Sequence, residues 1–89
     1  MTIIYHILLT YKYEADDLIS KNDLKSRFTD YAKKYSHCSS AKQGGYLGEY
    51  KYAKFLEEFS EVVKILKMNE ISKPVRTKHG YHIILKKDQ

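Results

Sequence analysis

Two histidines lie in nearly identical segments at opposite ends of the chain. His6 belongs to Tyr5-His6-Ile7-Leu8-Leu9, and His82 belongs to Tyr81-His82-Ile83-Ile84-Leu85. Imidazole can donate or accept a hydrogen bond, transfer a proton or bind a metal near neutral pH. Both segments are short and rich in aromatic and β-branched residues, which is typical of β-strands. If the strands are neighbours, the pattern predicts a histidine pair on one face of a sheet, with Cβ atoms about 5 Å apart.

Three further side chains could make that pair a metal site. His37, Cys38 and His79 are zinc ligands by type, as His6 and His82 are. Their spacing matches no standard zinc motif, and hydrogen-bonded imidazoles need no ion, so we expect neither a metal nor a cofactor. On the pattern alone, such histidines are more often buried core residues than functional ones, and such a cysteine is more often an inert buried thiol.

Helical spacing of apolar residues predicts three helices around the strands. We expect a first helix from about residue 14 that breaks near 22–26, a second over 28–35, and a third over 55–66 that ends at Met68-Asn69. The expected buried faces are Ala15, Leu18 and Ile19; Phe28, Tyr31, Ala32 and Tyr35; and Phe55, Phe59, Val62, Val63 and Leu66.

Short aromatic or β-branched runs predict four strands, at 2–10, 46–50, 75–78 and 80–86. The first is apolar on both faces, which is typical of an interior strand. Segment 36–43 has the composition of a polar loop, and the Gly44-Gly45 pair after it supplies backbone conformations closed to other residues. His79-Gly80 should form the tight turn into the last strand.

Composition bounds the class of protein. At 89 residues the chain should be one domain, 1–89, and its charge of +5 is spread along the sequence rather than gathered in a basic patch. We therefore expect no nucleic-acid partner, and no apolar run approaches the roughly 20 residues of a membrane span.

The single cysteine, Cys38, favours a reducing, cytoplasmic setting. The apolar N-terminal run lacks the basic region and cleavage pattern of a secretory leader. An extracytoplasmic location stays open if this is a domain excised from a longer exported chain.

Several short motifs occur together in a characteristic order. They are His6-Ile7-Leu8; Phe28, Ala32, Tyr35-Ser36 and Cys38; Gly44-Gly45-Tyr46-Leu47-Gly48; Phe59 with Glu70-Ile71-Ser72, Pro74-Val75 and Thr77; and Gly80-Tyr81-His82-Ile83-Ile84. In this order and spacing the chain resembles the parvulin family of peptidyl-prolyl cis/trans isomerases, or rotamases, from about Tyr5 to Lys86.

The resemblance implies an α+β fold. It would be a four-stranded antiparallel sheet surrounded by about four helices, in the order β-α-α-α-β-α-β-β, with the two histidine strands central and adjacent. The resemblance also implies that His6, Cys38, Thr77 and His82 form a catalytic polar network. Leu47, Phe55 and Phe59 would bind the substrate proline ring, with His79 as a third imidazole nearby.

The implied function is isomerisation of Xaa–Pro bonds in proline-containing polypeptides by a monomeric folding helper. Rotation about an amide makes and breaks no bond, so we expect non-covalent distortion. The chain departs from the family pattern at Phe55, usually methionine, and at Tyr46, usually aspartate. It also lacks an arginine-rich loop after the first strand, so we expect no phospho-specificity. The alternative is a non-catalytic chaperone module that uses the same pocket.

Overall fold

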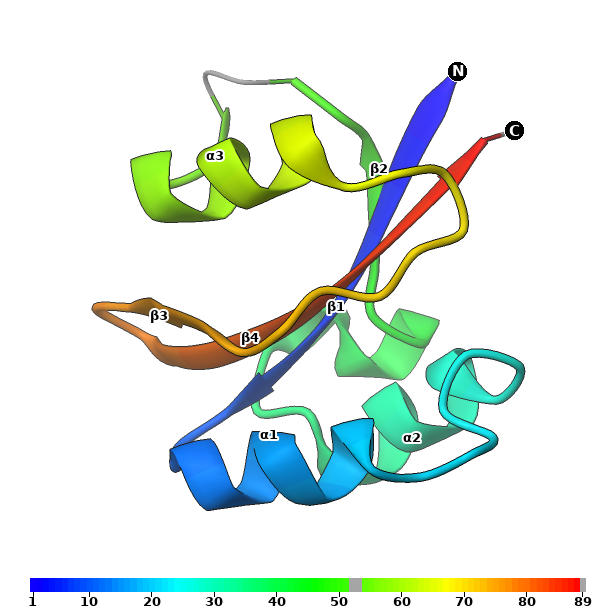
Figure 1. Cartoon of the computed structure of the whole chain (residues 1–89), viewed down its shortest axis with the longest axis vertical. Coiled ribbons are helices and arrows are strands. Elements are labelled where there is room, and N and C mark those ends of the chain that lie inside the picture. Colours follow the sequence, from blue (N-terminus) through cyan, green and yellow to red (C-terminus); the bar gives the residue numbers. More distant parts are fainter. Residues whose placement is uncertain (52–53, 89) are drawn as a thin grey trace.

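A four-stranded antiparallel sheet in the order β2-β1-β4-β3 separates two layers of helices in the computed structural model, which describes residues 1–51 and 54–88 (Figure 1). Helix α3 covers one face of the sheet, and α1 and α2 cover the other. The elements are β1 (Thr2–Leu9), α1 (Lys12–Ile19), α2 (Phe28–Tyr35), the 3-10 helix η1 (Ser39–Gln43), β2 (Tyr46–Glu49), α3 (Glu57–Ile65), β3 (Val75–Thr77) and β4 (Gly80–Asp88).

The two histidine-bearing strands, β1 and β4, are neighbours at the centre of the sheet, as the family resemblance implied. In their antiparallel register His6 lies opposite Ile84, and Leu8 lies opposite His82. The imidazoles are therefore diagonal neighbours on one face and not a directly facing pair. Diagonal side chains remain within reach of each other when they are long or aromatic.

Both faces of the sheet are buried, which explains the unbroken apolar runs of β1 and β4. The core towards α1 and α2 consists of Ile7, Leu9, Ala15, Leu18, Leu24, Phe28, Ala32, Ile83 and Leu85. The core towards α3 consists of Ile4, Phe59, Val63, Leu66, Val75 and Ile84. Each large apolar side chain buried in this way contributes about 1.5–3 kcal/mol to folding.

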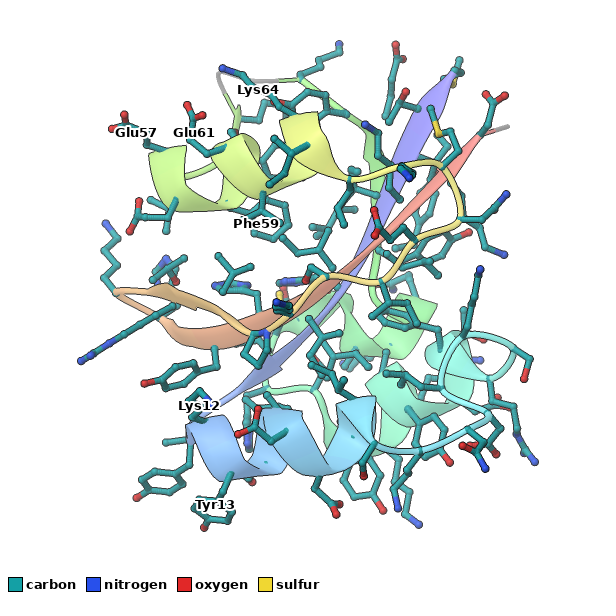
Figure 2. The ribbon with its side chains drawn as sticks, in the orientation of Figure 1. Lys12, Tyr13, Glu57, Phe59, Glu61 and Lys64 are labelled. Atoms are coloured by element: carbon teal, nitrogen blue, oxygen red, sulfur yellow. The ribbon has the colours of Figure 1, made fainter. Side chains whose placement is uncertain are left out.

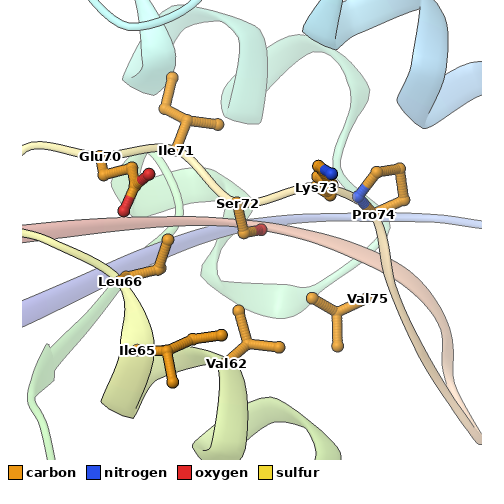
Figure 3. A pocket seen from close by; sticks show the side chains of 9 residues that line it. All are labelled: Val62, Ile65, Leu66, Glu70, Ile71, Ser72, Lys73, Pro74 and Val75. Carbon is orange, nitrogen blue, oxygen red and sulfur yellow. The ribbon is translucent and has the colours of Figure 1, made fainter.

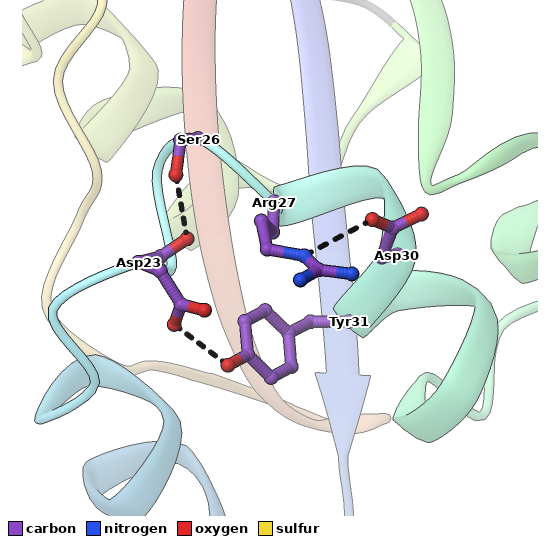
Figure 4. A network of polar contacts seen from close by, with 5 residues as sticks. All are labelled: Asp23, Ser26, Arg27, Asp30 and Tyr31. Atoms are coloured by element: carbon purple, nitrogen blue, oxygen red, sulfur yellow. Dashed lines mark hydrogen bonds and ion pairs between the residues drawn. The ribbon is translucent and has the colours of Figure 1, made fainter.

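The helix break predicted near residues 22–26 is a turn that polar contacts connect to α2 (Figure 4). The Tyr31 hydroxyl donates to Asp23 Oδ1 at 2.7 Å, and the Ser26 hydroxyl donates to the Asp23 carbonyl at 3.2 Å. Arg27 pairs with Asp30 at 3.3 Å. The hydrogen bond with Asp23 also raises the pKa of Tyr31. These contacts hold the turn where Leu24 enters the core.

Helix α1 begins two residues before the predicted start, at Lys12. The Glu14 carboxylate accepts a hydrogen bond from the Tyr11 N–H at 2.9 Å, which satisfies a donor at the helix N-terminus. The link from β1 to α1 is therefore only Thr10 and Tyr11. Segment 36–43, predicted as a polar loop, contains the 3-10 helix η1, which is the third of the four helices in the family order.

Helix α3 is shorter than predicted at both ends. It begins at Glu57, so Phe55 precedes the helix and does not lie on its face. It ends at Ile65, before Met68, although Asn69 does adopt the expected positive φ of 67° in the following turn. The Lys86 ammonium on β4 donates to the carbonyls of Val63 and Leu66, each at 2.9 Å. A cation is favourable at a helix C-terminus, so β4 itself anchors the end of α3.

Within the described part of the chain, no helix combines the length and apolar character needed to cross a bilayer.

Candidate active site

A buried chain of hydrogen bonds links the two central strands to β3. His6 Nδ1 lies 3.0 Å from His82 Nδ1, and His82 Nε2 lies 2.7 Å from Thr77 Oγ1. The His79 backbone N–H donates to the same Thr77 oxygen at 3.2 Å. His6, His82 and Thr77 are at most 7% exposed. The structure thus brings together three of the four residues predicted for a polar network.

The geometry of this network allows two proton arrangements. A neutral imidazole carries one proton, so one Nδ1 of the close pair donates and the other accepts. If His82 Nδ1 donates, the Thr77 hydroxyl donates to His82 Nε2, and the proton of His6 is on Nε2. If His6 Nδ1 donates, His82 Nε2 donates to Thr77. In both cases His6 Nε2 is buried without a hydrogen-bond partner among the described residues.

Burial keeps both imidazoles neutral. It is the main cause that lowers the pKa of His6 to about 4, with the neighbouring His82 adding to the effect. Burial likewise lowers the pKa of His82 to about 4, assisted by His79 and opposed by the carboxylate of Glu58. Neutral rings suit a role in which His6 and His82 hold the shape of the site through hydrogen bonds.

These pKa values predict that the free energy of unfolding falls as the pH drops below 6.5. The unfolded chain, with imidazole pKa values near 6.5, binds more protons between pH 6.5 and 4 than the folded protein does. Stability is thus complete above pH 6.5 and is lost towards pH 4. The loss should reach about 2 kcal/mol per imidazole by about pH 5.

Urea denaturation at about pH 7.5 and about pH 5 measures this loss, since few carboxylates titrate in that interval. The imidazole carbon resonances of the folded protein provide the residue-specific check. Equal unfolding free energies at the two pH values, or resonances of His6 and His82 that titrate near 6.5, would contradict the prediction.

A stack of aromatic rings covers the histidine pair on the α3 side. Phe59 meets both imidazoles edge to face, with ring centroids 5.8 Å from His6 and 5.3 Å from His82. Phe55 stacks on Phe59 at 5.1 Å, and Tyr50 stacks on Phe55 at 5.8 Å. The expected pairing of the two phenylalanines therefore holds, although a bend and not a helical turn brings Phe55 there.

A pocket of about 250 Å³ opens over these rings. Its lining is His6, Cys38, Leu47, Lys54, Phe55, Leu56, Phe59, His79 and His82. Every predicted site residue lines it except Thr77, which lies behind His82 and contacts it by hydrogen bond. Sequence reasoning missed Lys54 and Leu56, whose only signal was their position on either side of Phe55.

The loop after α2 places Cys38 at this pocket. Ser36 Oγ accepts hydrogen bonds from the backbone N–H groups of Leu8, at 3.0 Å, and Cys38, at 3.3 Å. The His37 N–H donates to the Leu8 carbonyl at 2.8 Å. These bonds tie the loop to the end of β1, where the half-buried Cys38 faces the site.

Gly45 places Leu47 and β2. The His6 N–H donates to the Gly45 carbonyl at 2.9 Å, and a Cβ on Gly45 would lie only 2.3 Å from the His6 carbonyl oxygen. Gly45 also has φ of +85°, a conformation that favours glycine. This contact accounts for the glycine at 45. Gly44 has its own reasons, a φ of +69° and the Thr29 Cβ, which would lie 2.7 Å from an added Cβ.

A larger cavity, of about 460 Å³, lies between α3 and segment 70–75 (Figure 3). It is lined by Val62, Ile65, Leu66, Glu70, Ile71, Ser72, Lys73, Pro74 and Val75 and contains no imidazole or thiol. The chemistry is therefore concentrated in the smaller pocket. No three histidine, cysteine or carboxylate side chains of the described residues are grouped closely enough to hold a metal ion.

A central histidine pair beneath an aromatic pocket, on a four-stranded sheet between helix layers, defines a parvulin-like domain. The family model of the PPIC-type peptidyl-prolyl isomerase (rotamase) domain matches residues 9–88. The chain belongs to this family, which confirms the resemblance and the fold that it implied.

Relatives of two kinds share the domain. The foldase protein PrsA of Bacillus subtilis is 42% identical over 85 residues, which cover 94% of this chain and 29% of that protein. The peptidyl-prolyl cis-trans isomerase Pin1 of Malus domestica is 44% identical over 69 residues, covering 78% of this chain and 54% of that protein. The chain thus spans less than a third of the foldase it resembles.

Solved structures agree with these matches. PrsA from Bacillus subtilis superposes with a TM-score of 0.89 at 41% identity, covering 99% of this chain and 35% of that one. NmPin, the parvulin of Nitrosopumilus maritimus, superposes with a TM-score of 0.84 at 32% identity, covering 97% and 94%. A third structure superposes with a TM-score of 0.90 at 33% identity, covering 98% of this chain and 38% of that one. Its description names PEB4 and the periplasmic protein Cj1289 of Campylobacter jejuni as SurA-like chaperones.

Proposed function

We propose that this domain is a peptidyl-prolyl cis/trans isomerase that accelerates rotation about Xaa–Pro bonds in polypeptides. The observation that carries the proposal is the contact of Phe59 with both neutral imidazoles at the base of an aromatic pocket. This arrangement offers an apolar surface for a prolyl ring and a rigid polar support behind it. Family membership supports the same activity.

Catalysis on this proposal is non-covalent. Rotation about the amide must cross a barrier of about 18–20 kcal/mol, and the planar amide is the more polar form. A pocket that removes water from the amide therefore favours the twisted form. Each reduction of the barrier by about 1.4 kcal/mol accelerates the reaction tenfold.

The residues divide into two groups. Leu47, Phe55 and Phe59 bind the prolyl ring by apolar and aromatic contact. His6, His82 and Thr77 form the supporting network.

Cys38 and His79 complete the lining of the pocket. Cys38 lies beside the path of the substrate without bonding to it, and His79 also supports Thr77 through its backbone N–H.

The substrates on this proposal are proline-containing polypeptides that are not phosphorylated. With only Thr10 and Tyr11 between β1 and α1, the chain has no room there for a long basic loop. We take residues 1–89 as a single domain that acts as a monomer. The single cysteine favours a cytoplasmic location, whereas the likeness to the SurA-like chaperone structure, whose description names a periplasmic protein, favours the alternative of a domain from an exported protein.

An isomerisation assay on peptides with apolar, acidic or phosphorylated residues before proline tests the proposal. We expect activity without a preference for phosphate, and at least about tenfold lower kcat/KM in Phe55→Ala, because the ring stacked on Phe59 is lost. Ile65→Ala is the matched control, since Ile65 is 80% exposed on α3 and lines the other cavity.

The alternative, a non-catalytic chaperone module with the same pocket, predicts a different result. Such a protein would be folded and inactive on the whole panel, yet would bind proline peptides with an affinity that Phe55→Ala weakens. The Phe55 ring, where the family usually has methionine, is the feature that favours this second reading.

A further inference from the structure

A second pocket lies on the other side of the sheet, between α1 and the end of α2. It encloses about 410 Å³ and is lined by Leu9, Tyr13, Glu14, Asp17, Leu18 and Tyr35. Among the described residues it shares none with the pocket of about 250 Å³ over Phe59, which we call the proline pocket. Figure 2 shows the separation, with Tyr13 on the α1 side of the sheet and Phe59 on the α3 side. A ligand here would not enter the isomerase site.

Two exposed tyrosines stand over an apolar floor in this pocket. Leu9 and Leu18 are buried, whereas Tyr13 is 70% exposed and Tyr35 is 40% exposed. Tyr35 was expected on the buried face of α2, but it ends the helix and lies beside α1. The Tyr13 ring stacks on Tyr11 at 5.4 Å, which restricts it before any ligand arrives.

The Tyr35 ring already accommodates a cation. The Lys34 ammonium lies 5.1 Å from its centroid. A cation over a tyrosine face is attracted by the negative potential of the ring. The Tyr35 side of the pocket can therefore form a cation–π contact.

Both charged side chains that line the pocket are acidic. Among the described residues they are Glu14 and Asp17, although the chain as a whole carries +5 and the Lys34 ammonium lies over the Tyr35 ring. Glu14 uses Oε1 to cap Tyr11. Asp17 makes one ion pair, with Lys21 at 4.0 Å, whereas the adjacent Asp16 is paired with Lys12 at 2.8 Å. The Asp17 carboxylate is therefore less closely paired than that of Asp16.

We propose that this pocket binds a lysine or arginine side chain of an extended polypeptide. The aliphatic stem would pack on Leu9 and Leu18, and the charged head would lie between the tyrosine rings and the carboxylates. An organic cation with an apolar stem suits a pocket of this size and floor better than a metal ion does. The proposal goes beyond isomerisation and does not require it, because the peptide contact is separate from proline.

Titration of the protein with a proline-free, lysine-containing peptide, followed by amide chemical shifts, tests the proposal. We expect shifts confined to α1 and the end of α2, and loss of binding when the lysines of the peptide are acetylated. Tyr13→Ala and Asp17→Asn should each weaken binding by about two- to fivefold, the factor expected for one exposed cation–π or ionic contact.

Asp16→Asn is the matched control, because it removes a neighbouring carboxylate of α1 that does not line the pocket. Asp17→Asn keeps the backbone carbonyl that accepts from the Ser20 hydroxyl, so the helix end is unchanged. The proposal fails if Asp16→Asn weakens binding as much as Asp17→Asn, if the acetylated peptide binds equally, or if the shifts occur at the proline pocket. It also fails if no shift occurs in the folded protein.

Discussion

Replacing Gly45 by alanine should lower the free energy of unfolding by at least about 3 kcal/mol, the largest single effect we expect. The new Cβ would lie 2.3 Å from the carbonyl oxygen of His6, which is backbone and cannot rotate away. The positive φ of 85° adds strain of about 1 kcal/mol or more. Relief requires that β2 move away from β1, which would also break the hydrogen bond from the His6 N–H to the Gly45 carbonyl.

Gly48→Ala is the matched control for Gly45→Ala. Gly48 has a nearly identical φ of +89°, yet its nearest atom to a new Cβ is 3.9 Å away, on the side chain of Tyr46. The Gly48→Ala variant should therefore have the backbone strain of a positive φ without the steric clash. Its free energy of unfolding should fall by about 1–2 kcal/mol. Urea denaturation of both variants measures the difference, and equal losses would show that the contact with His6 carries no special cost.

Replacing His82 by alanine should cost about 3 kcal/mol of stability and at least about tenfold in kcat/KM. The substitution leaves a cavity beside Phe59 and removes the partner of His6 Nδ1. The Thr77 hydroxyl also loses its bond to His82 and keeps only the one from the His79 N–H among the described residues. Buried polar groups without partners are costly, and Phe59 loses one of the two imidazoles that it contacts. Thermal melting and the isomerisation assay measure the two effects.

Thr77→Val separates the hydrogen bond from the packing. It removes only the hydroxyl of a buried residue of similar shape, so it should cost about 1 kcal/mol and leave Phe59 supported. An unchanged melting temperature in His82→Ala would contradict the structural role of the network. A normal kcat/KM in a folded His82→Ala protein would contradict its role in catalysis.

Local patterns were sufficient to predict most of the secondary structure. The apolar run around His6 indicated an interior strand, and the family resemblance implied that the His82 strand lies beside it. Both strands are central in the sheet. Periodicity located the two apolar faces of the second and third helices because burial of Phe28, Ala32, Phe59 and Val63 requires residues spaced by one turn. The order of short motifs then identified the family, which the comparisons confirm.

The site could be predicted as a set of residues but not as a geometry. The family resemblance supplied His6, His82, Thr77, Cys38 and the two phenylalanines, and the structure brings them together. Their catalytic and binding roles stay predictions until the variants are assayed. Lys54 and Leu56 were missed because they lie in a connecting segment. A single residue there belongs to no periodic pattern from which its burial or contacts could be predicted.

The strands, most of the helix faces and the family thus followed from the types and spacing of neighbouring residues, although Tyr35 and Phe55 were placed wrongly on their helix faces. The three-dimensional fold, by contrast, sets the diagonal register of His6 and His82, the stacking of Phe55 outside the helix and the second pocket beside Tyr35. Each of these depends on contacts between elements far apart in the chain. Such contacts are set by sheet register and helix packing, which no local pattern encodes.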